Sequence, residues 1–269
     1  MAIIKQLLGG NEKAIIEKAA RIMKEGGVII FPTESSYGIG TDALNETAIR
    51  KIAPIKGQSG EKNISIIVSD LEQAKRFGKI GGEAEKLVKK FMPGPLTLVV
   101  EKQPGVPDSL AERTIAFRIS GNTIAREICS ALGNAVTATS ANMHGKPSTY
   151  SAREAIKEFN SRVHMIIDAG ELPHNAPSTI YDVAQKKVLR NGPITEQQSF
   201  QMKAADAAFF QMKRTAMPRR KAAWSQGSLH PTITAAQSAS LKALWKRQKL
   251  KCAILIWWRS ARVPAWALH

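Results

Sequence analysis

Several loops of this chain carry hydroxyl and cationic side chains, and each of these loops lies at an end of a predicted strand. Hydroxyls and cations without a neighbouring nucleophile–base pair suit an anionic ligand, a phosphate or a carboxylate, bound by position and charge. One arginine, Arg118, lies within an apolar strand and needs a partner for its charge if it is buried. The other candidates are the hydroxyls of Thr33, Ser140, Ser148 and Ser178 and the cations of Lys56, Lys62 and Arg190.

The chain lacks the sequence signatures of several common catalytic sites. Its five histidines have no metal-ligand spacing, and its two cysteines, Cys129 and Cys252, are too few for a zinc site or a disulfide framework. It contains no G-x-S-x-G turn for a nucleophilic serine, no phosphate-loop lysine motif and no G-x-G-x-x-G. These absences favour a site that binds its ligands by position and charge.

The stretch Phe31–Asp42 follows a buried apolar run, Val28–Ile30, which predicts a strand. We expect this strand to end in a loop. The glycines of Gly38-Ile39-Gly40 then mark a place where the backbone lies close to another group, since glycine has no Cβ. Tyr37 adds a ring with a polar tip. The alternative is a tight turn that happens to contain two glycines.

Hydrophobic periodicity predicts helices and strands that alternate irregularly up to about residue 195, which favours an α/β or α+β domain with a mixed sheet. Asn11, Asn45 and Asp70 are expected helix N-caps. The expected helices run from Asn11 to Lys24, from Asn45 past Ile52, from Asp70 to Phe77, and over Glu83–Phe91, Thr123–Leu132 and Ala152–Phe159. The expected strands cover Val28–Phe31, Ile64–Val68, Leu96–Val100, Thr114–Ile119, Ala135–Thr139, Met165–Asp168, Thr179–Val183 and Lys187–Leu189.

Charge and tryptophan are distributed unevenly along the chain. The formal net charge is +17, and residues 200–269 contain 13 Lys or Arg against one acid, Asp206, for a net +12. All five tryptophans also follow residue 200. We therefore divide the chain into a globular domain, residues 1–199, and a basic tail, residues 200–269. Within the tail, Leu241–Ile256 is a candidate basic amphipathic helix, but no periodicity persists, so we expect the tail to be disordered or loosely helical.

The sequence predicts neither a membrane span nor a secretion signal. It has no run of 18 apolar residues, and its N-terminus lacks the charged-then-apolar pattern of a signal peptide. We therefore expect a cytoplasmic protein without a membrane partner.

The polar loops also match, in order, eight motifs of one known family. They are Pro32-Thr33-Glu34-x-x-Tyr37-Gly38-x-Gly40, Lys56-Gly57-Gln58, Pro93-Gly94-Pro95-x-Thr97, Phe117-Arg118-Ile119, Ser140-Ala141-Asn142-x-x-Gly145-x-Pro147-Ser148, Asp168-x-Gly170, Pro177-Ser178-Thr179-Ile180-x-Asp182 and Arg190-x-Gly192. Over about residues 10–195 the chain resembles the YrdC-like family of threonylcarbamoyl-adenylate synthases.

The resemblance implies a fold and a reaction. The fold is a twisted, open, mixed α/β sheet with flanking helices and a concave basic cavity. The enzymes of this family combine L-threonine, bicarbonate or CO₂, and ATP with its Mg²⁺, and they release pyrophosphate and threonylcarbamoyl-AMP. A partner complex then transfers the threonylcarbamoyl group to an adenosine of certain tRNAs. A carbamate oxygen of the substrate attacks the α-phosphorus, so the protein supplies alignment and charge and no nucleophile.

The resemblance also implies a role for each candidate residue. Arg118 would hold the threonine carboxylate through two parallel hydrogen bonds. Lys56 would contact the phosphates of ATP and, with Arg118, align the substrates. The remaining threonine contacts would be Thr33, Lys62 and Ser178. The nucleotide would be bound by Lys56, Gln58, Ser140, Asn142, Ser148 and Arg190.

The chain departs from the family pattern at three places. The family usually has Lys-x-Arg in the second motif, and Gln58 occupies the arginine position. Glutamine carries no charge, and losing one charge-assisted contact costs about 1.5–3 kcal/mol of binding. Lys62, from the same loop, is a hypothetical replacement. The usual Pro-Leu after this loop reads Asn63-Ile64, and the usual Ser of Asn-x-Ser-Gly is His144.

Two alternatives to the synthase follow from these features. The first is a related domain that binds RNA or a nucleotide through a basic groove and has lost adenylation, which Gln58 and the basic tail favour. The second is carbamoyl adenylation in the manner of hydrogenase-maturation proteins. Those chains carry acylphosphatase-like and zinc-finger regions upstream of the related domain, whereas here the likeness begins at about residue 10. This alternative is therefore the weaker one.

Overall fold

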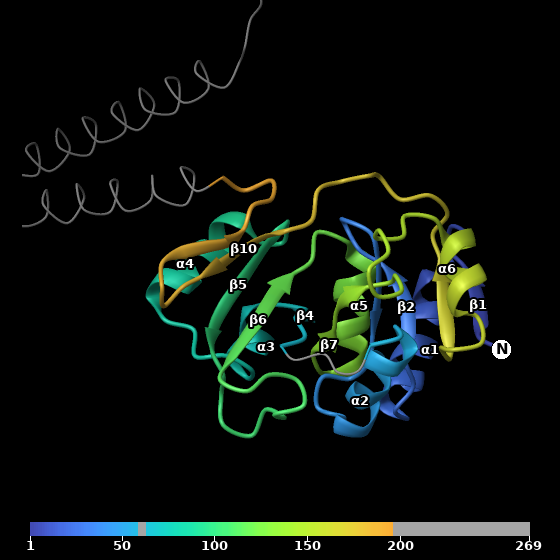
Figure 1. The fold of residues 1–269 in the computed structure, drawn as a ribbon, viewed down its shortest axis with the longest axis horizontal. Coiled ribbons are helices and arrows are strands. Elements are labelled where there is room, and N and C mark those ends of the chain that lie inside the picture. The colour runs from blue at the N-terminus through green and yellow to red at the C-terminus, as the bar shows by residue number, and fades with distance from the viewer. Residues whose placement is uncertain (59–62, 196–269) are drawn as a thin grey trace, which may run out of the picture. The chain divides into compact units, whose positions relative to one another are not determined.

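Two mixed β-sheets organise the part of the chain that the computed structural model describes, residues 1–58 and 63–195 (Figure 1). The sequence predicted one mixed sheet, and the structure corrects this to two. The mixed α/β fold with open sheets and flanking helices is as expected. The predicted tail, the boundary near residue 199, and Lys62 lie outside the described residues and stay predictions.

The first sheet has the strand order β1-β9-β2-β3-β8. Strands β1 and β2 both pair in parallel with β9, while β3 is antiparallel to both β2 and β8. Neither β1 nor β3 was predicted, because β1 is a short exposed edge and β3 contains the two glycines that indicated a loop. The strands are β1 (Ile3–Gln6), β2 (Ile29–Pro32), β3 (Tyr37–Gly40), β8 (Thr139–Ser140) and β9 (Met165–Asp168).

The second sheet has the strand order β11-β10-β5-β6-β4-β7. Its parallel pairs are β5 with β10 and β4 with β6, and its other pairs are antiparallel. The strands are β4 (Ile66–Val68), β5 (Leu96–Glu101), β6 (Thr114–Ile119), β7 (Val136–Thr137), β10 (Thr179–Asp182) and β11 (Lys187–Arg190). Every one of them overlaps a strand predicted from the sequence.

The chain passes directly from one sheet to the other at Ala138. The single strand predicted over Ala135–Thr139 is therefore two short strands, β7 in the second sheet and β8 in the first. Gly40 of β3 lies against this crossing: a Cβ at residue 40 would stand 1.8 Å from the carbonyl oxygen of Thr137. The close approach expected at these glycines is thus made by the protein's own backbone where the two sheets meet.

Helices cover both faces of the first sheet. Side chains alternate along β2, so Ile29 and Phe31 pack in one apolar cluster with helices α1 and α5, while Ile30 packs in another cluster with α6. Helices α2, α3 and α4 contribute apolar side chains to the core of the second sheet. The helices are α1 (Glu12–Lys24), α2 (Glu46–Ile55), α3 (Leu71–Lys75), α4 (Gly82–Phe91), α5 (Thr123–Leu132) and α6 (Ala152–Phe159).

Two of the three predicted N-caps make the capping hydrogen bond. Asn45 accepts from the backbone N–H of Ala48, and Asp70 accepts from that of Gln73. Asn11 precedes α1 as predicted, but its side chain bonds the turn before the helix instead. Helix α3 ends two residues short of its predicted end. None of the helices in residues 1–58 and 63–195 is long and apolar enough to cross a membrane.

Candidate functional site

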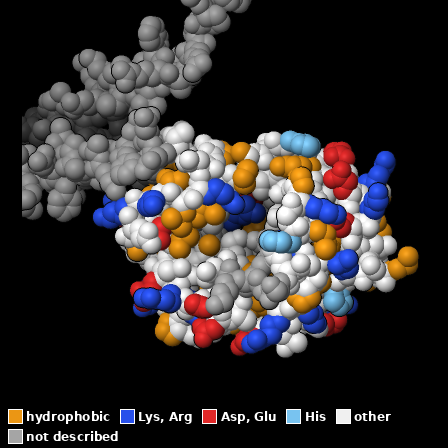
Figure 2. All heavy atoms as spheres, viewed as in Figure 1, with side chains coloured by type: hydrophobic (Ala, Val, Ile, Leu, Met, Phe, Trp, Pro, Cys, Tyr) orange, Lys and Arg blue, Asp and Glu red, His pale blue; other side chains and the backbone are white. Residues whose placement is uncertain are grey.

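A cavity of about 470 Å³ opens between the two sheets, on a face where Lys and Arg side chains gather (Figure 2). Ten hydroxyl-bearing side chains and two arginines lie in its wall, and none of its described lining residues is a carboxylate. The residues that contribute these groups are Thr33, Ser35, Ser36, Tyr37, Ser65, Thr97, Arg118, Thr139, Ser140, Ser148, Ser178 and Arg190.

One wall is a row of side chains across four strands of the second sheet. Ile180 of β10 is paired with Arg190 of β11 on one side and with Thr97 of β5 on the other. Leu98 of β5 is paired with Phe117 of β6, so continuing this antiparallel register by one pair sets Arg118 opposite Thr97. Paired residues on neighbouring strands point to the same face, and this row therefore faces the cavity together.

Arg118 has the charged partner that the sequence predicted it would need. Its Nη1 lies 3.1 Å from Oε1 of Glu34, and both side chains are largely buried. The ion pair lacks the alignment of a hydrogen bond, since Oε1 of Glu34 has no hydrogen-bond donor. The other carboxylate oxygen, Oε2, accepts a hydrogen bond from the hydroxyl of Ser120. Arg118 makes no other polar contact among the described residues, so most of its donors are available to a ligand.

Arg190 is held by neutral groups. Its Nε and Nη2 donate to the carbonyl oxygen of Ser178 at 3.0 and 2.9 Å, and Nη2 lies 3.1 Å from the Ser178 hydroxyl. Partial burial of the guanidinium, and then the nearby charge of Arg118, lower the pKa of Arg190. An arginine stays protonated even so. Two like charges therefore face the same cavity and favour an anion there.

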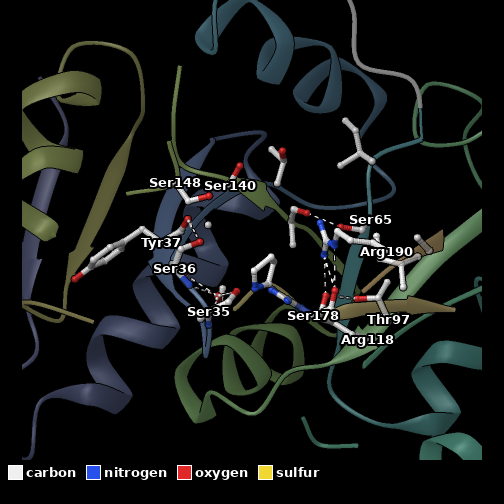
Figure 3. A pocket seen from close by; sticks show the side chains of 18 of the residues that line it. Ser35, Ser36, Tyr37, Ser65, Thr97, Arg118, Ser140, Ser148, Ser178 and Arg190 are labelled. Carbon is white, nitrogen blue, oxygen red and sulfur yellow. Dashed lines mark hydrogen bonds between the residues drawn. The ribbon is translucent and has the colours of Figure 1, made fainter. Parts of the chain in front are cut away.

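Ser178, which directly precedes β10, contacts Thr97 of β5. Their hydroxyls lie 2.8 Å apart, and both residues are almost fully buried. Figure 3 shows these two residues beside Arg118 and Arg190. The predicted contact residue Ser178 thus lines the cavity and orients Arg190 at the same time.

The opposite wall begins with the loop between β2 and β3. The Thr33 hydroxyl donates to the carbonyl oxygen of Ser36 at 2.7 Å and accepts from the backbone N–H groups of Ser35 and Ser36, each at 3.3 Å. These bonds shape the loop, since a Thr hydroxyl that bonds its own backbone replaces a turn hydrogen bond. Thr33 lines the cavity as predicted, but much of its hydrogen-bonding capacity is already used.

Ser140 and Ser148 line the same side of the cavity, across from the two arginines (Figure 3). Lys56 is buried and reaches the wall indirectly: its ammonium donates to the hydroxyl of Thr139 at 2.7 Å, and Thr139 lines the cavity. The structure therefore places Lys56 behind the wall that carries Ser140 and Ser148, and its contact with the nucleotide stays a prediction.

Gln58 and Asn142 do not lie in the cavity wall. Nε2 of Gln58 is 2.6 Å from Nδ1 of His144, so two of the three departures from the family pattern contact each other. Oε1 of Gln58 is buried without a hydrogen-bond partner. The Asn142 amide donates to the carbonyl oxygens of Met143 and Lys146, which shapes its own loop. The contacts expected of Gln58 and Asn142 with a nucleotide stay predictions.

Tyr37 anchors one of the segments that connect the two sheets. This crossover segment, residues 169–178, runs from β9 to β10 (Figure 1). The Tyr37 hydroxyl accepts from the N–H of Ala169 and donates to the carbonyl oxygen of Gly170, both at 2.9 Å. Burial raises the pKa of this phenol to about 12. The polar tip of Tyr37 therefore has a structural role.

Sequence reasoning missed several residues of the site. Glu34 stands in the first quoted motif, but its link to Arg118 joins positions 84 residues apart, which no local pattern reveals. The other missed residues lack a signal because serine and threonine are common in loops; they are Ser35, Ser36, Ser65, Thr97 and Thr139.

The assembled groups suit an anionic ligand with several oxygens. Two guanidinium groups offer paired N–H donors, and the hydroxyls offer single donors around them. Residues 1–58 and 63–195 contain no group of three His, Cys, Asp or Glu that could hold a metal ion. The cavity can therefore bind and align carboxylates or phosphates by charge and direction.

A protein-family model places the chain among known sequences. The model Sua5_yciO_yrdC, described as "Telomere recombination", matches residues 21–192. The threonylcarbamoyl-AMP synthase of Pyrococcus abyssi is 36% identical over 188 residues, which cover 69% of this chain and 55% of that protein. The threonylcarbamoyl-AMP synthase of Bacillus subtilis is 33% identical over 192 residues, covering 68% of this chain and 55% of that protein. The chain thus spans about half the length of these two curated relatives.

The fold is also similar to a solved structure. The structure described as P. abyssi Sua5 complexed with L-threonine matches with a TM-score of 0.68 and 33% sequence identity. The match covers 75% of this chain and 60% of that one.

Proposed function

Since this chain belongs to the Sua5/YciO/YrdC family, we propose that it is a nucleotidyltransferase that makes threonylcarbamoyl-AMP and pyrophosphate. Its substrates are L-threonine, bicarbonate or CO₂, and ATP. Two relatives carry the name of this synthase, and a similar structure is of a protein complexed with L-threonine. The observation that carries the proposal is the pair of arginines, Arg118 and Arg190, in a cavity whose described lining is rich in hydroxyls and contains no carboxylate.

The cavity groups fit the needs of this reaction. The amine of threonine adds CO₂ and becomes a carbamate, and a carbamate oxygen then attacks the α-phosphorus of ATP as pyrophosphate leaves. All reacting atoms belong to the substrates, so the protein supplies alignment and neutralises charge. A cavity with two guanidinium groups and many hydroxyl donors provides both.

In this proposal, residues of both cavity walls contact each substrate. Arg118 holds the threonine carboxylate through two N–H donors, and Ser178 lies beside it. Lys56 acts on the phosphates from behind Thr139, and Ser140, Ser148 and Arg190 line the nucleotide side. Thr33 shapes the loop that faces threonine. Lys62 completes the threonine contacts.

We propose that Mg²⁺ enters with the triphosphate. The described lining of the cavity offers no carboxylate, the usual protein ligand of this ion, so its ligands are phosphate oxygens and water. Bound in this way, Mg²⁺ supplies charge neutralisation of the leaving pyrophosphate.

We propose that the product passes to a complex that modifies tRNA, which places the protein in threonylcarbamoyladenosine synthesis. Threonylcarbamoyl-AMP is a mixed anhydride and transfers its acyl group readily to a nucleophile. An enzyme that makes it therefore needs an acceptor system close by.

Pyrophosphate release from ATP tests the proposal. The full chain is assayed with Mg²⁺ and bicarbonate, with and without L-threonine, and the product is identified by mass spectrometry. We expect release that depends on threonine and a product with the mass of threonylcarbamoyl-AMP. A folded chain that releases no pyrophosphate would overturn the synthase. Retained ATP or RNA binding would then favour a binding relative of the family.

A further inference from the structure

We propose that Glu34 is a positioning residue: its carboxylate, braced by Ser120, sets the orientation in which Arg118 presents its guanidinium to the cavity. This inference rests on the proposed function, in which Arg118 binds the threonine carboxylate. Glu34 itself is absent from the cavity lining, so it acts through Arg118 rather than on a substrate.

The contacts of Glu34 leave its carboxylate little freedom. Oε2 is bonded to the hydroxyl of Ser120, a fully buried residue that follows β6 directly. Ser120 also accepts from the N–H of Asn122, the N-cap of α5, at 3.1 Å. Gly121 packs against the Glu34 side chain, since a Cβ there would lie 3.5 Å from Cβ of Glu34. The carboxylate is thus fixed by the same segment that ends the strand of Arg118.

The ion pair holds Arg118 at one nitrogen only. Nη1 lies 3.1 Å from Oε1 of Glu34, and the contact is not an aligned hydrogen bond. A guanidinium held at one corner keeps its remaining donors for a ligand, whereas two aligned bonds to Glu34 would occupy the donor pair that a carboxylate ligand needs. Glu34 therefore orients Arg118 without occupying the N–H donors that a carboxylate ligand needs.

Glu34 also offsets the repulsion between the two arginines. The hydrogen-bond partners of Arg190 in residues 1–58 and 63–195 are neutral, and burial followed by the charge of Arg118 lowers its pKa. Without a carboxylate beside it, Arg118 would tend to turn away from Arg190 and from the cavity. Removing the Glu34 charge thus has two opposite effects, a more positive cavity and a less well-placed guanidinium.

Glu34 further connects this arginine to the crossover segment. The Asn175 amide donates to the backbone carbonyl oxygen of Glu34 at 2.9 Å. Pro177 and Ser178 at the end of that segment line the cavity. The loop that carries Glu34 is therefore held from both sheets. This fits a positioning residue, because a guanidinium can form two parallel hydrogen bonds with a carboxylate only when its orientation is well defined.

Two substitutions in the full chain separate positioning from charge. Glu34→Gln keeps the shape and removes the charge, and Glu34→Asp keeps the charge but shortens its reach to Arg118 and Ser120. We expect both to raise the KM for L-threonine, by roughly tenfold for the loss of one charge-assisted contact, while the KM for ATP changes by less than about twofold. Glu101→Gln, an exposed carboxylate at the far end of β5, is the matched charge control.

A ligand with an altered carboxylate supplies the second measurement. L-threonine amide lacks the carboxylate charge, so the wild-type chain should use or bind it more weakly than L-threonine. If Glu34 positions Arg118 for that carboxylate, the preference for L-threonine over L-threonine amide becomes smaller in both Glu34 variants. A general loss of folding would lower the response to both ligands alike and leave their ratio unchanged. Far-UV circular dichroism and thermal melting record folding directly.

The outcomes distinguish this inference from the proposed function. If the wild-type chain neither binds threonine nor releases pyrophosphate, both fail. If the wild-type chain is active and the Glu34→Asp variant has an unchanged KM for threonine, only the inference fails. A lowered KM for threonine in Glu34→Gln would also overturn it, because cavity charge and not arginine position would then dominate.

Discussion

Gln58 and His144 form a contact that neither residue would suggest alone. Their side chains lie 2.6 Å apart and join the loop after α2 to the loop after β8. The backbone supports this link, since the N–H of His144 donates to the carbonyl oxygen of Lys56 at 2.9 Å. Gln58 and Lys56, just after α2, are therefore both joined to His144, and Gln58 supplies no charge of its own.

Replacing Gln58 by arginine tests whether this chain lacks a phosphate contact. Under the proposed function, Gln58→Arg adds a guanidinium beside Lys56 and should lower the KM for ATP by roughly tenfold, the value of one charge-assisted hydrogen bond. Steady-state pyrophosphate release measures the change. Repeating the Gln58→Arg measurement in a His144→Ala background shows whether the gain in ATP affinity is independent of the contact between residues 58 and 144. An unchanged KM for ATP would count against a missing arginine contact.

At the scale of elements, Gly40 decides whether β3 can reach the junction of the two sheets. A Cβ at this residue would lie 1.8 Å from the Thr137 carbonyl oxygen, a backbone atom that cannot move aside. We expect Gly40→Ala to lower the free energy of unfolding by about 3 kcal/mol or more. The control is Gly82→Ala, in open space at the start of α4, where alanine should be neutral or stabilising by up to about 1 kcal/mol. Chemical denaturation measures both, and equal stabilities would contradict the argument.

Tyr37 gives the crossover segment a pH-dependent anchor. Burial raises its pKa to about 12, above the ordinary value of 10.0 that applies in an unfolded chain. The stabilisation from the neutral phenol is fully present below pH 10 and is lost as the pH rises towards 12. In an ultraviolet titration of the chain's tyrosines, we expect a late phase near pH 12, and we expect Tyr37→Phe to remove that phase.

The same substitution should reduce stability near neutral pH. Tyr37→Phe removes the acceptor of the Ala169 N–H and one of the two donors to the Gly170 carbonyl oxygen, which also accepts from the N–H of Ala152, at a cost of about 1–3 kcal/mol. Tyr150→Phe, at a tyrosine that stacks on His174, is the control for loss of a phenol. If both variants unfold at the same denaturant concentration, the anchor has no energetic role.

At the scale of the whole molecule, the charge is concentrated outside the family match. Residues 200–269 carry a net +12 of the total +17, and the family model ends at residue 192. We predict that a chain ending at residue 199 keeps threonine-dependent pyrophosphate release within about twofold, because it retains the whole family match and every described lining residue of the cavity. The full chain is the control, and a large loss of activity would show that the tail contributes to the reaction.

The sequence by itself determined most elements and the composition of the site. Apolar periodicity located the helices and nine of the eleven strands of the described residues. It missed β1 because that strand is exposed, and β3 because that strand carries two glycines. Eight ordered motifs sufficed for the family resemblance. Such features are local, and local residue types express them directly.

Only the tertiary structure decided which residues meet. It split one predicted strand between two sheets at Ala138, set Arg118 in a row with Thr97 and Arg190, and paired Arg118 with Glu34. It also showed that Gly40 is approached by backbone and that Tyr37 points its hydroxyl at the crossover segment. These contacts join positions far apart in the chain, and their geometry depends on sheet register and packing, which no single stretch of sequence encodes.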